Sequence, residues 1–364
     1  MTCMLSRFPN LFSLPTPHSS LNMNLKNLIN FALLLAATTA AAQENGYVVT
    51  GTLDLPDGTE VSIASETDTA FAVDMGKAVI IDKRFTIRGK VEKPLKSTLM
   101  TNNLQLIEKN QWPDDSIHWT YTDFFLSNGH ISVAPDLSIS GTSVQQDYND
   151  LLRMGGEQGD SLWQFIDTHP HSPVAVWVAN RMLQRGYRLT ADEVTHLERT
   201  VSAHDDPLRM EEFAKRIEYA KKTTKNSPLI DLDLIDINGN RCQLTDVVPR
   251  ERLVLIDFWA SWCGICLHSM PAIKELAEKY KETFSVVAVS IDTKEKNWRM
   301  AMQKHPEPWP QYLVTSQGYD DFFHKYQVGN GVPYYLLLST EGKVIASPSG
   351  PEEIAEMLQE LTNQ

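Results

Sequence analysis

The sequence predicts a chain of three parts: a small all-β domain, a helical spacer and a C-terminal α/β domain. Short alternating apolar runs fill the first part, apolar residues three or four positions apart fill the second, and strand-like and helix-like segments alternate in the third. A chain of 364 residues with 42% hydrophobic content can bury more than one core. We therefore expect domains over residues 43–143, 144–226 and 227–364.

Residues 1–42 have the features of upstream residues followed by a secretory signal peptide. From Met23, an adequate start of translation, a short basic region precedes an apolar stretch at 28–37 and small residues that end at Ala42. This stretch is too short for a membrane anchor, which needs about 18 apolar residues or more. We expect cleavage near Ala42 and export of the mature protein.

Charge and cysteine usage narrow the function further. The net charge is −13 and no basic block occurs, which argues against a nucleic-acid partner. After cleavage the cysteines are Cys242, Cys263 and Cys266, and an oxidising compartment favours a disulfide between the two close ones. Cys242 alternates with Leu244 in a strand pattern, so we expect it to be a small buried apolar side chain.

The β-rich region runs from Tyr47 to about Ser140. Its strand-like runs are 47–49, 61–63, 78–81, 85–87 and 130–133, with turns at Pro56-Asp57-Gly58 and Asn128-Gly129. It carries no cluster of Cys, His or carboxylates at ligand spacing. We interpret it as a sandwich for docking or homodimerisation.

The next region has helical spacing. Apolar residues recur at 162, 165 and 166 and again at 174, 177, 178 and 182, and Thr190 with Glu193 predicts a capping box. His169 and His171 flank a proline, and His204 follows later. Since no carboxylate or thiol stands at a suitable spacing, we interpret these histidines as loop residues rather than metal ligands.

The C-terminal region predicts an α/β order of elements. They are a hairpin at Asn238-Gly239, a strand ending at Trp259, a helix from Cys266 to about Lys281, a strand at 286–291, a helix around 298–302, a hairpin of 334–338 with 343–346, and a helix at 352–361.

Trp262-Cys263-Gly264-Ile265-Cys266 follows the apolar strand and begins a helix. Backbone N–H groups and the dipole at a helix N-terminus stabilise a thiolate, which lowers the pKa of the first cysteine from about 8.5 toward ~7 or below. We expect Cys263 to be the exposed nucleophile and Cys266 to resolve a mixed disulfide. The pair could also be half of a zinc site, but the one near candidate for a further ligand, His268, falls on a different helix face, so we expect no metal.

Asp257 stands in the middle of the apolar strand, six residues before Cys263. Burial should raise the pKa of its carboxyl group, which could then accept the proton that Cys266 loses when it attacks. The simpler alternative is a strand-end Asp that caps a backbone group. Two prolines complete the pattern: Pro271 should kink the helix, and a cis bond before Pro333 would be one way to leave the Val332 backbone exposed beside the cysteines.

The segment 257–266, together with Pro271 and Val332-Pro333, resembles the active-site frame of the thioredoxin superfamily. The export signal, the strand ending at 289–292 and the helix within 298–309 are similar to its TlpA/ResA-like periplasmic branch. The resemblance covers about 227–364, and the β-rich part looks like an N-terminal domain of uncharacterised type.

The resemblance implies a thioredoxin-like fold and a redox-active disulfide of Cys263 with Cys266 that needs no cofactor. It also implies a cis Pro333 beside the dithiol, with Val332 pairing to the substrate backbone. Trp262, Gly264 and Ile265 are the other expected substrate contacts. Two features depart from the frame: Ile265 is neither Pro nor His, and the loop 329–331 is rich in Gly.

We therefore expect an envelope thiol-disulfide oxidoreductase that reduces exported proteins and is itself reduced by a membrane dithiol donor. The same site could act as an oxidant or isomerase, or the two thiolates could serve a metal-binding chaperone. A peroxidase is a weaker alternative, because no Thr-x-x-Cys motif precedes the site.

Overall fold

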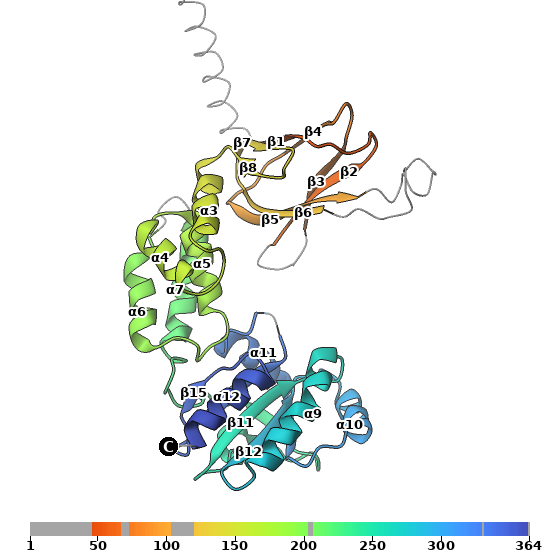
Figure 1. Ribbon diagram of the computed structural model, residues 1–364. Coiled ribbons are helices and arrows are strands. Elements are labelled where there is room, and N and C mark those ends of the chain that lie inside the picture. Colours follow the sequence, from red (N-terminus) through yellow and green to blue (C-terminus); the bar gives the residue numbers. More distant parts are fainter. Residues whose placement is uncertain (1–45, 67–72, 103–119, 203–206, 330, 363–364) are drawn as a thin grey trace, which may run out of the picture.

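The computed structural model describes residues 46–66, 73–102, 120–202, 207–329 and 331–362 (Figure 1). The predicted leader, His204 and Asn330 lie outside these ranges. In chain order the described residues form a β-sandwich, a group of five helices and an α/β domain. Within them, no helix has the length and apolar character needed to cross a membrane.

The sandwich consists of two four-stranded sheets, ordered β4-β1-β7-β8 and β3-β2-β5-β6. Their apolar faces share one core that includes Val49, Leu99 and Phe124. The strands are β1 Tyr47–Thr52, β2 Glu60–Ser65, β3 Val73–Val79, β4 Arg84–Gly89, β5 Leu95–Asn102, β6 Thr120–Leu126, β7 Gly129–Val133 and β8 Ile139–Ser140. The run predicted at 78–81 was placed too late, because β3 ends at Val79 and Ile81 forms only an isolated bridge.

The strands β5, β6 and β8 were not predicted, and β5 includes Lys96 at a buried position. The Lys96 ammonium lies 2.5 Å from a Glu157 carboxylate oxygen and 3.2 Å from one of Asp123. It also sits 5.0 Å from the ring centroid of Tyr148 and 5.1 Å from that of Trp177. These contacts compensate the desolvation of the charge, and they join the sandwich to the helices.

The helical segment has its own core, which includes Phe165, Val178 and Leu197. Its helices are α3 Ser143–Arg153, α4 Asp160–Thr168, α5 Pro173–Leu183, α6 Ala191–Thr200 and α7 Pro207–Ala220. The predicted capping box is confirmed at the start of α6, where the Glu193 N–H donates to the Thr190 hydroxyl and the Thr190 N–H to the Glu193 carboxylate.

The C-terminal domain is built on a seven-stranded mixed sheet in the order β10-β9-β13-β12-β11-β14-β15. The strands are β9 Asp233–Ile235, β10 Arg241–Gln243, β11 Leu253–Trp259, β12 Phe284–Ser290, β13 Gln311–Val314, β14 Tyr334–Leu338 and β15 Val344–Ala346. The helices are α8 Leu244–Val247, α9 Gly264–Lys279, α10 Glu295–Lys304, α11 Ser316–Lys325 and α12 Pro351–Thr362. All predicted elements of this domain are present, whereas α8, β13 and α11 were not predicted.

The central strand β11 is buried along its whole length, and its side chains alternate between two helical layers. Phe258 packs on Phe322 of α11, with ring centroids 4.8 Å apart. The neighbouring Asp257 therefore points to the other face. There it lies beside its cross-strand partner Tyr335, whose hydroxyl lies near the Ser269 side chain of α9. This alternation directs the Asp257 carboxyl toward the helix that carries Cys266.

Candidate active site

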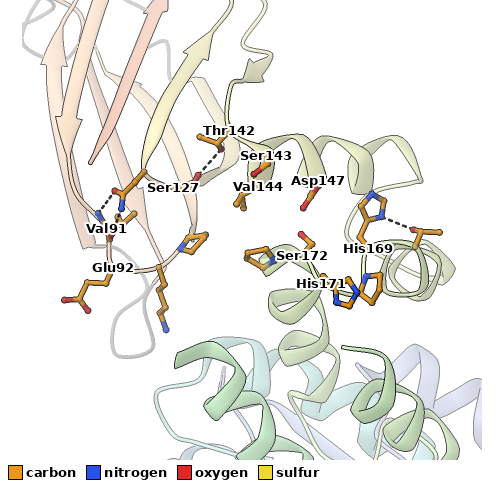
Figure 2. Close-up of a pocket in the computed structure, with 16 residues that line it drawn as sticks. Val91, Glu92, Ser127, Thr142, Ser143, Val144, Asp147, His169, His171 and Ser172 are labelled. Atoms are coloured by element: carbon orange, nitrogen blue, oxygen red, sulfur yellow. Dashed lines mark hydrogen bonds between the residues drawn. The ribbon is translucent and has the colours of Figure 1, made fainter. Parts of the chain in front are cut away.

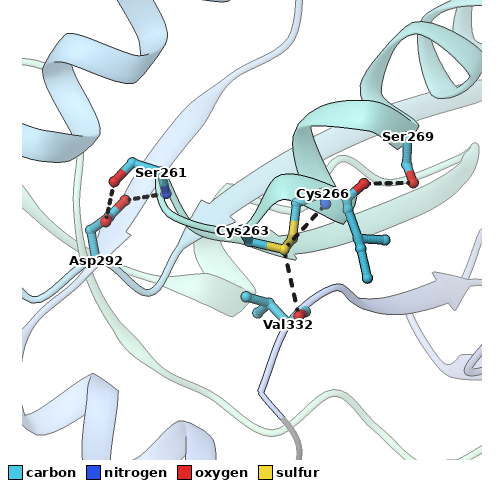
Figure 3. The surroundings of a disulfide bond; sticks show 7 residues. Ser261, Cys263, Cys266, Ser269, Asp292 and Val332 are labelled. Atoms are coloured by element: carbon cyan, nitrogen blue, oxygen red, sulfur yellow. Dashed lines mark hydrogen bonds between the residues drawn. A yellow bond between two sulfur atoms is a disulfide. The ribbon is translucent and has the colours of Figure 1, made fainter. Parts of the chain in front are cut away.

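Cys263 and Cys266 form a disulfide at the first turn of α9, with their Cα atoms 5.3 Å apart (Figure 3). Cys263 is the N-cap residue, and the Cys266 N–H points at its sulfur from 3.1 Å. After reduction the same N–H can stabilise a Cys263 thiolate. The prediction that Cys263 is exposed is wrong: only 6% of it is accessible, against 1% of Cys266, because other segments cover the disulfide.

Val332 is one of the residues that cover the disulfide. Its carbonyl oxygen lies 3.6 Å from Cys263 Sγ (Figure 3). The oxidised sulfur has no hydrogen, so this is a packing contact here; a reduced Cys263 thiol could donate to the same oxygen. The peptide bond between Val332 and Pro333 is cis, as the resemblance implied. Two segments 69 positions apart thus meet at the sulfur that is predicted to be the nucleophile.

Asp257 is fully buried on β11, and burial raises the pKa of its carboxyl group to about 7. The predicted direction is confirmed. Oδ1 has no hydrogen-bond partner within the described part of the chain, so the alternative of a capping Asp has no support from that atom. A carboxyl group with this pKa can hold or release a proton near neutral pH, which is what the attack by Cys266 requires.

The loop before α9 is fixed by polar contacts, and one exposed apolar side chain lies in this loop and another in the first turn of α9. Asp292 accepts hydrogen bonds from the Ser261 N–H at 2.9 Å and the Ser261 hydroxyl at 2.6 Å (Figure 3). Trp262 is 64% exposed and Ile265 is 69% exposed. Between them, Gly264 leaves open space where a Cβ would be. An anchored loop with exposed apolar residues around a sulfur offers a surface for a partner protein.

The remaining cysteine and the candidate histidine of α9 lie apart from this chemistry. Cys242 is a free, half-buried thiol on β10, and burial raises its pKa, so it stays protonated at neutral pH. His268 is exposed on α9. The helix α9 continues through Pro271, whose missing N–H removes one backbone bond.

A cluster missed by the sequence analysis surrounds His169. Asp147 and Asp150 of α3 each place an oxygen within 4.8 Å of one of its ring nitrogens, although neither stands at ligand spacing from it in the sequence. Packing of α3 against α4 brings these residues together. Asp150 also accepts hydrogen bonds from Gln146 and Arg153, and its second oxygen lies 3.5 Å from His169 Nε2. These contacts account for the approach of Asp150 to His169.

Asp147 and His169 line a cleft of about 550 Å³ between the sandwich and the helices (Figure 2). Its other walls come from the segments 91–94 and 127–128 of the sandwich and from the turn 168–173. The cleft belongs to the domains that precede the disulfide domain, and we assign it no role in the redox chemistry.

Comparisons with known proteins identify relatives of the C-terminal domain. A family model of thioredoxin-like proteins matches residues 251–344. A thioredoxin of Acidithiobacillus ferridurans is 30% identical over 120 residues, which are 33% of this chain and 86% of that protein. The thiol-disulfide oxidoreductase ResA of Bacillus cereus is 28% identical over 131 residues, 35% of this chain and 72% of that protein.

Among solved structures, the thioredoxin domain of a thiol-disulfide oxidoreductase from Bacteroides vulgatus is similar, with 25% identity and a TM-score of 0.35. The matched region makes up 38% of this chain and 96% of that domain. The relatives described here match the C-terminal domain. Through this domain the chain belongs to the thioredoxin superfamily, and it is a thiol-disulfide oxidoreductase of the thioredoxin type.

Proposed function

We propose that this enzyme works in the periplasm as a reductant of disulfides in exported proteins, and that a membrane dithiol donor reduces it in turn. The predicted signal peptide supports the location. The observation that carries the proposed chemistry is the Cys263–Cys266 disulfide at a helix N-terminus, beside the Val332 carbonyl and on the face of the sheet that holds a buried carboxyl group.

The reaction begins with the reduced pair. The Cys263 thiolate attacks one sulfur of the partner disulfide, so that a mixed disulfide forms and the other partner sulfur leaves as a thiolate. The Cys266 thiol then passes its proton to Asp257 and attacks Cys263, which releases the second partner thiolate. Two electrons have moved to the partner, the enzyme holds its disulfide, and the proton on Asp257 can return when the pair is reduced again.

Partner binding involves both sides of Cys263. The backbone of Val332 pairs with the partner chain beside its disulfide, with Pro333 next to it. Trp262 and Ile265 contact apolar residues of the partner, and Gly264 allows close approach because it presents no side chain. We keep homodimerisation through the sandwich as a separate proposal, which size measurements in solution can test.

The direction of electron flow is tested by the reduction potential of the pair in the chain from Gln43 to Gln364. Equilibration with defined thiol buffers should give a value near about −270 mV, whereas a value near about −120 mV would make the enzyme an oxidant. If no disulfide forms and Zn²⁺ or Cu⁺ binds stoichiometrically, a metal-binding chaperone replaces the proposal. Loss of that metal on Cys266→Ser would confirm the replacement.

A further inference from the structure

The connection between α5 and α6 packs on the domain that carries the disulfide. The Arg185 N–H donates to the Gln327 carbonyl at 2.9 Å, and the Gly186 N–H donates to the Tyr326 carbonyl at 2.8 Å. In the other direction, the Tyr334 hydroxyl donates to the Gly186 carbonyl at 2.8 Å. Tyr326 and Gln327 lead into the loop that ends at Pro333, and Tyr334 follows that proline. The connection therefore contacts both ends of the loop that covers Cys263.

The conformation of this connection is closely constrained. Arg185 has a φ of 63°, and Tyr187 has a φ of 67°, a region that L-residues seldom adopt. Between them, a Cβ on Gly186 would come within 2.8 Å of the Thr223 side chain. The Tyr187 hydroxyl donates to the Pro228 carbonyl at 3.1 Å. The backbone from which the side chains of this connection project is thus held in place.

Two of those side chains are guanidinium groups that approach the residues flanking Pro333 and the end of β15. Arg185 Cζ lies 5.8 Å from the ring centroid of Tyr334, the residue after Pro333. Arg188 donates to the Ser349 hydroxyl at 3.4 Å. Since β15 runs antiparallel to β14 with Ala346 opposite Leu337, the residues that follow β15 lie alongside the start of β14. Both arginines therefore stand where the chain emerges from Pro333.

Neither guanidinium is neutralised by a carboxylate in the part of the chain that the structure describes. Burial lowers the pKa of Arg185, and the nearby positive charge of Arg188 lowers it further. Arg188 Nε is buried and has no hydrogen-bond partner among the described residues. Two like charges held together, partly desolvated, attract an anion more strongly than exposed cations do. This contrasts with the overall charge of −13.

We propose that Arg185 and Arg188 form a binding site for carboxylate side chains that lie beside the disulfide of a protein partner; this assignment rests on the reductase activity proposed above. A guanidinium group matches a carboxylate with two parallel donors. The preferred partner combines an apolar residue for Trp262 and Ile265 with Asp or Glu in the segment that reaches the arginines. In this way the connection between α5 and α6 would select partners with acidic residues for the active site on the C-terminal domain.

The test measures the single-turnover, second-order rate constant for reduction of two disulfide peptides that are identical except that Glu residues near the cystine in one are Gln in the other. The reduced full chain from Gln43 supplies both electrons. We expect the wild type to prefer the Glu peptide by about fivefold or more at low salt, and the preference to shrink at about 0.5 M salt. Arg185→Gln should remove most of the preference, and Arg185→Glu should reverse it.

The matched control is Arg199→Gln, which removes an exposed arginine of α6 in the same segment and should leave the preference unchanged. Neutral 2-hydroxyethyl disulfide measures the dithiol itself, and the arginine variants should reduce it at the wild-type rate. Equal rates of the wild type with both peptides would overturn the binding site and leave the reductase standing. Failure of the wild type to reduce any of the three substrates would overturn the reductase instead.

Discussion

The Val332 carbonyl oxygen lies 3.6 Å from Cys263 Sγ, although 69 positions separate the two residues. The contact is made because β11 and β14 are antiparallel neighbours, with Phe258 opposite Tyr334. The end of β11 leads into the cysteine loop, and Val332-Pro333 precedes the start of β14. The sheet therefore places a sulfur beside a backbone carbonyl that a partner chain can share.

Replacement of Cys266 by Ser should trap the mixed disulfide between Cys263 and a partner, because no second sulfur remains to release it. Non-reducing gels and mass spectrometry would detect a one-to-one adduct that disappears with excess dithiol. Cys263→Ser should form no adduct, and its reduction of protein disulfides should fall to the uncatalysed rate. Substantial turnover by Cys263→Ser would contradict the assignment of the nucleophile.

Asp257→Asn should slow the release of the mixed disulfide by about 100-fold, since an amide cannot accept the Cys266 proton. The pKa of Asp257 is about 7, so the wild-type rate of this step should rise as the pH increases through that value. Stopped-flow measurement of partner release from pH 5 to 9 separates this step from the initial attack. An unchanged pH profile in Asp257→Asn would exclude the carboxyl group as the proton acceptor.

The same substitution should stabilise the oxidised enzyme at neutral and alkaline pH. The folded-state pKa of Asp257 is raised from 3.8 to about 7, so ionisation opposes folding. Below the unfolded pKa of about 4, the carboxyl group is protonated in both the folded and the unfolded state, and the wild type keeps its full stability. As the pH rises from there to about 7, the wild type loses stability relative to Asp257→Asn. Above that pH the difference in unfolding free energy should level off at no more than about 4 kcal/mol.

Urea unfolding of both oxidised proteins between pH 4 and 9 measures this difference. Asp320→Asn, at an exposed position of α11, serves as the control for loss of one carboxylate. A difference in unfolding free energy that stays constant from pH 4 to 9 would show that Asp257 does not titrate in this range.

Tyr334→Phe should destabilise the chain by about 1–3 kcal/mol, because the buried Gly186 carbonyl loses its hydrogen bond from the Tyr334 hydroxyl. The matched control is Tyr335→Phe, since the adjacent hydroxyl is buried but has no hydrogen-bond partner in the described residues. This second variant should stay within about 0.5 kcal/mol of the wild type. Equal losses in the two unfolding experiments would argue against the contact with the helical segment.

Trp262→Ala should raise KM for protein disulfides by about tenfold while the rate with 2-hydroxyethyl disulfide stays the same, because the lost apolar area contacts only a large partner. The side chain is 64% exposed, so the fold should tolerate the change. Met300→Ala, which removes a 58% exposed apolar side chain from α10, is the control. If both substrates slow equally, Trp262 acts on the dithiol and not on partner binding.

The redox pair could be predicted from the sequence, because its geometry is local. A three-residue spacing on a helix brings two sulfurs within bonding distance, and the apolar run before it specifies the buried strand that ends there. The raised pKa of Asp257 follows from the same run, since a carboxyl group in the middle of a buried strand loses its hydration whatever packs around it. The capping box of α6 is equally local.

Other features depend on segments far apart in the chain, and only the tertiary structure decided them. The strand β5 holds a buried lysine because Glu157, 61 positions later, neutralises it. The cover over Cys263 comes from Val332, and the carboxylates beside His169 come from another helix. Arg185 contacts the disulfide domain through its backbone bond to Gln327, and Arg188 contacts it through a side-chain hydrogen bond to Ser349. Local sequence patterns specify which groups must be buried or capped, whereas packing over long distances decides which partners they meet.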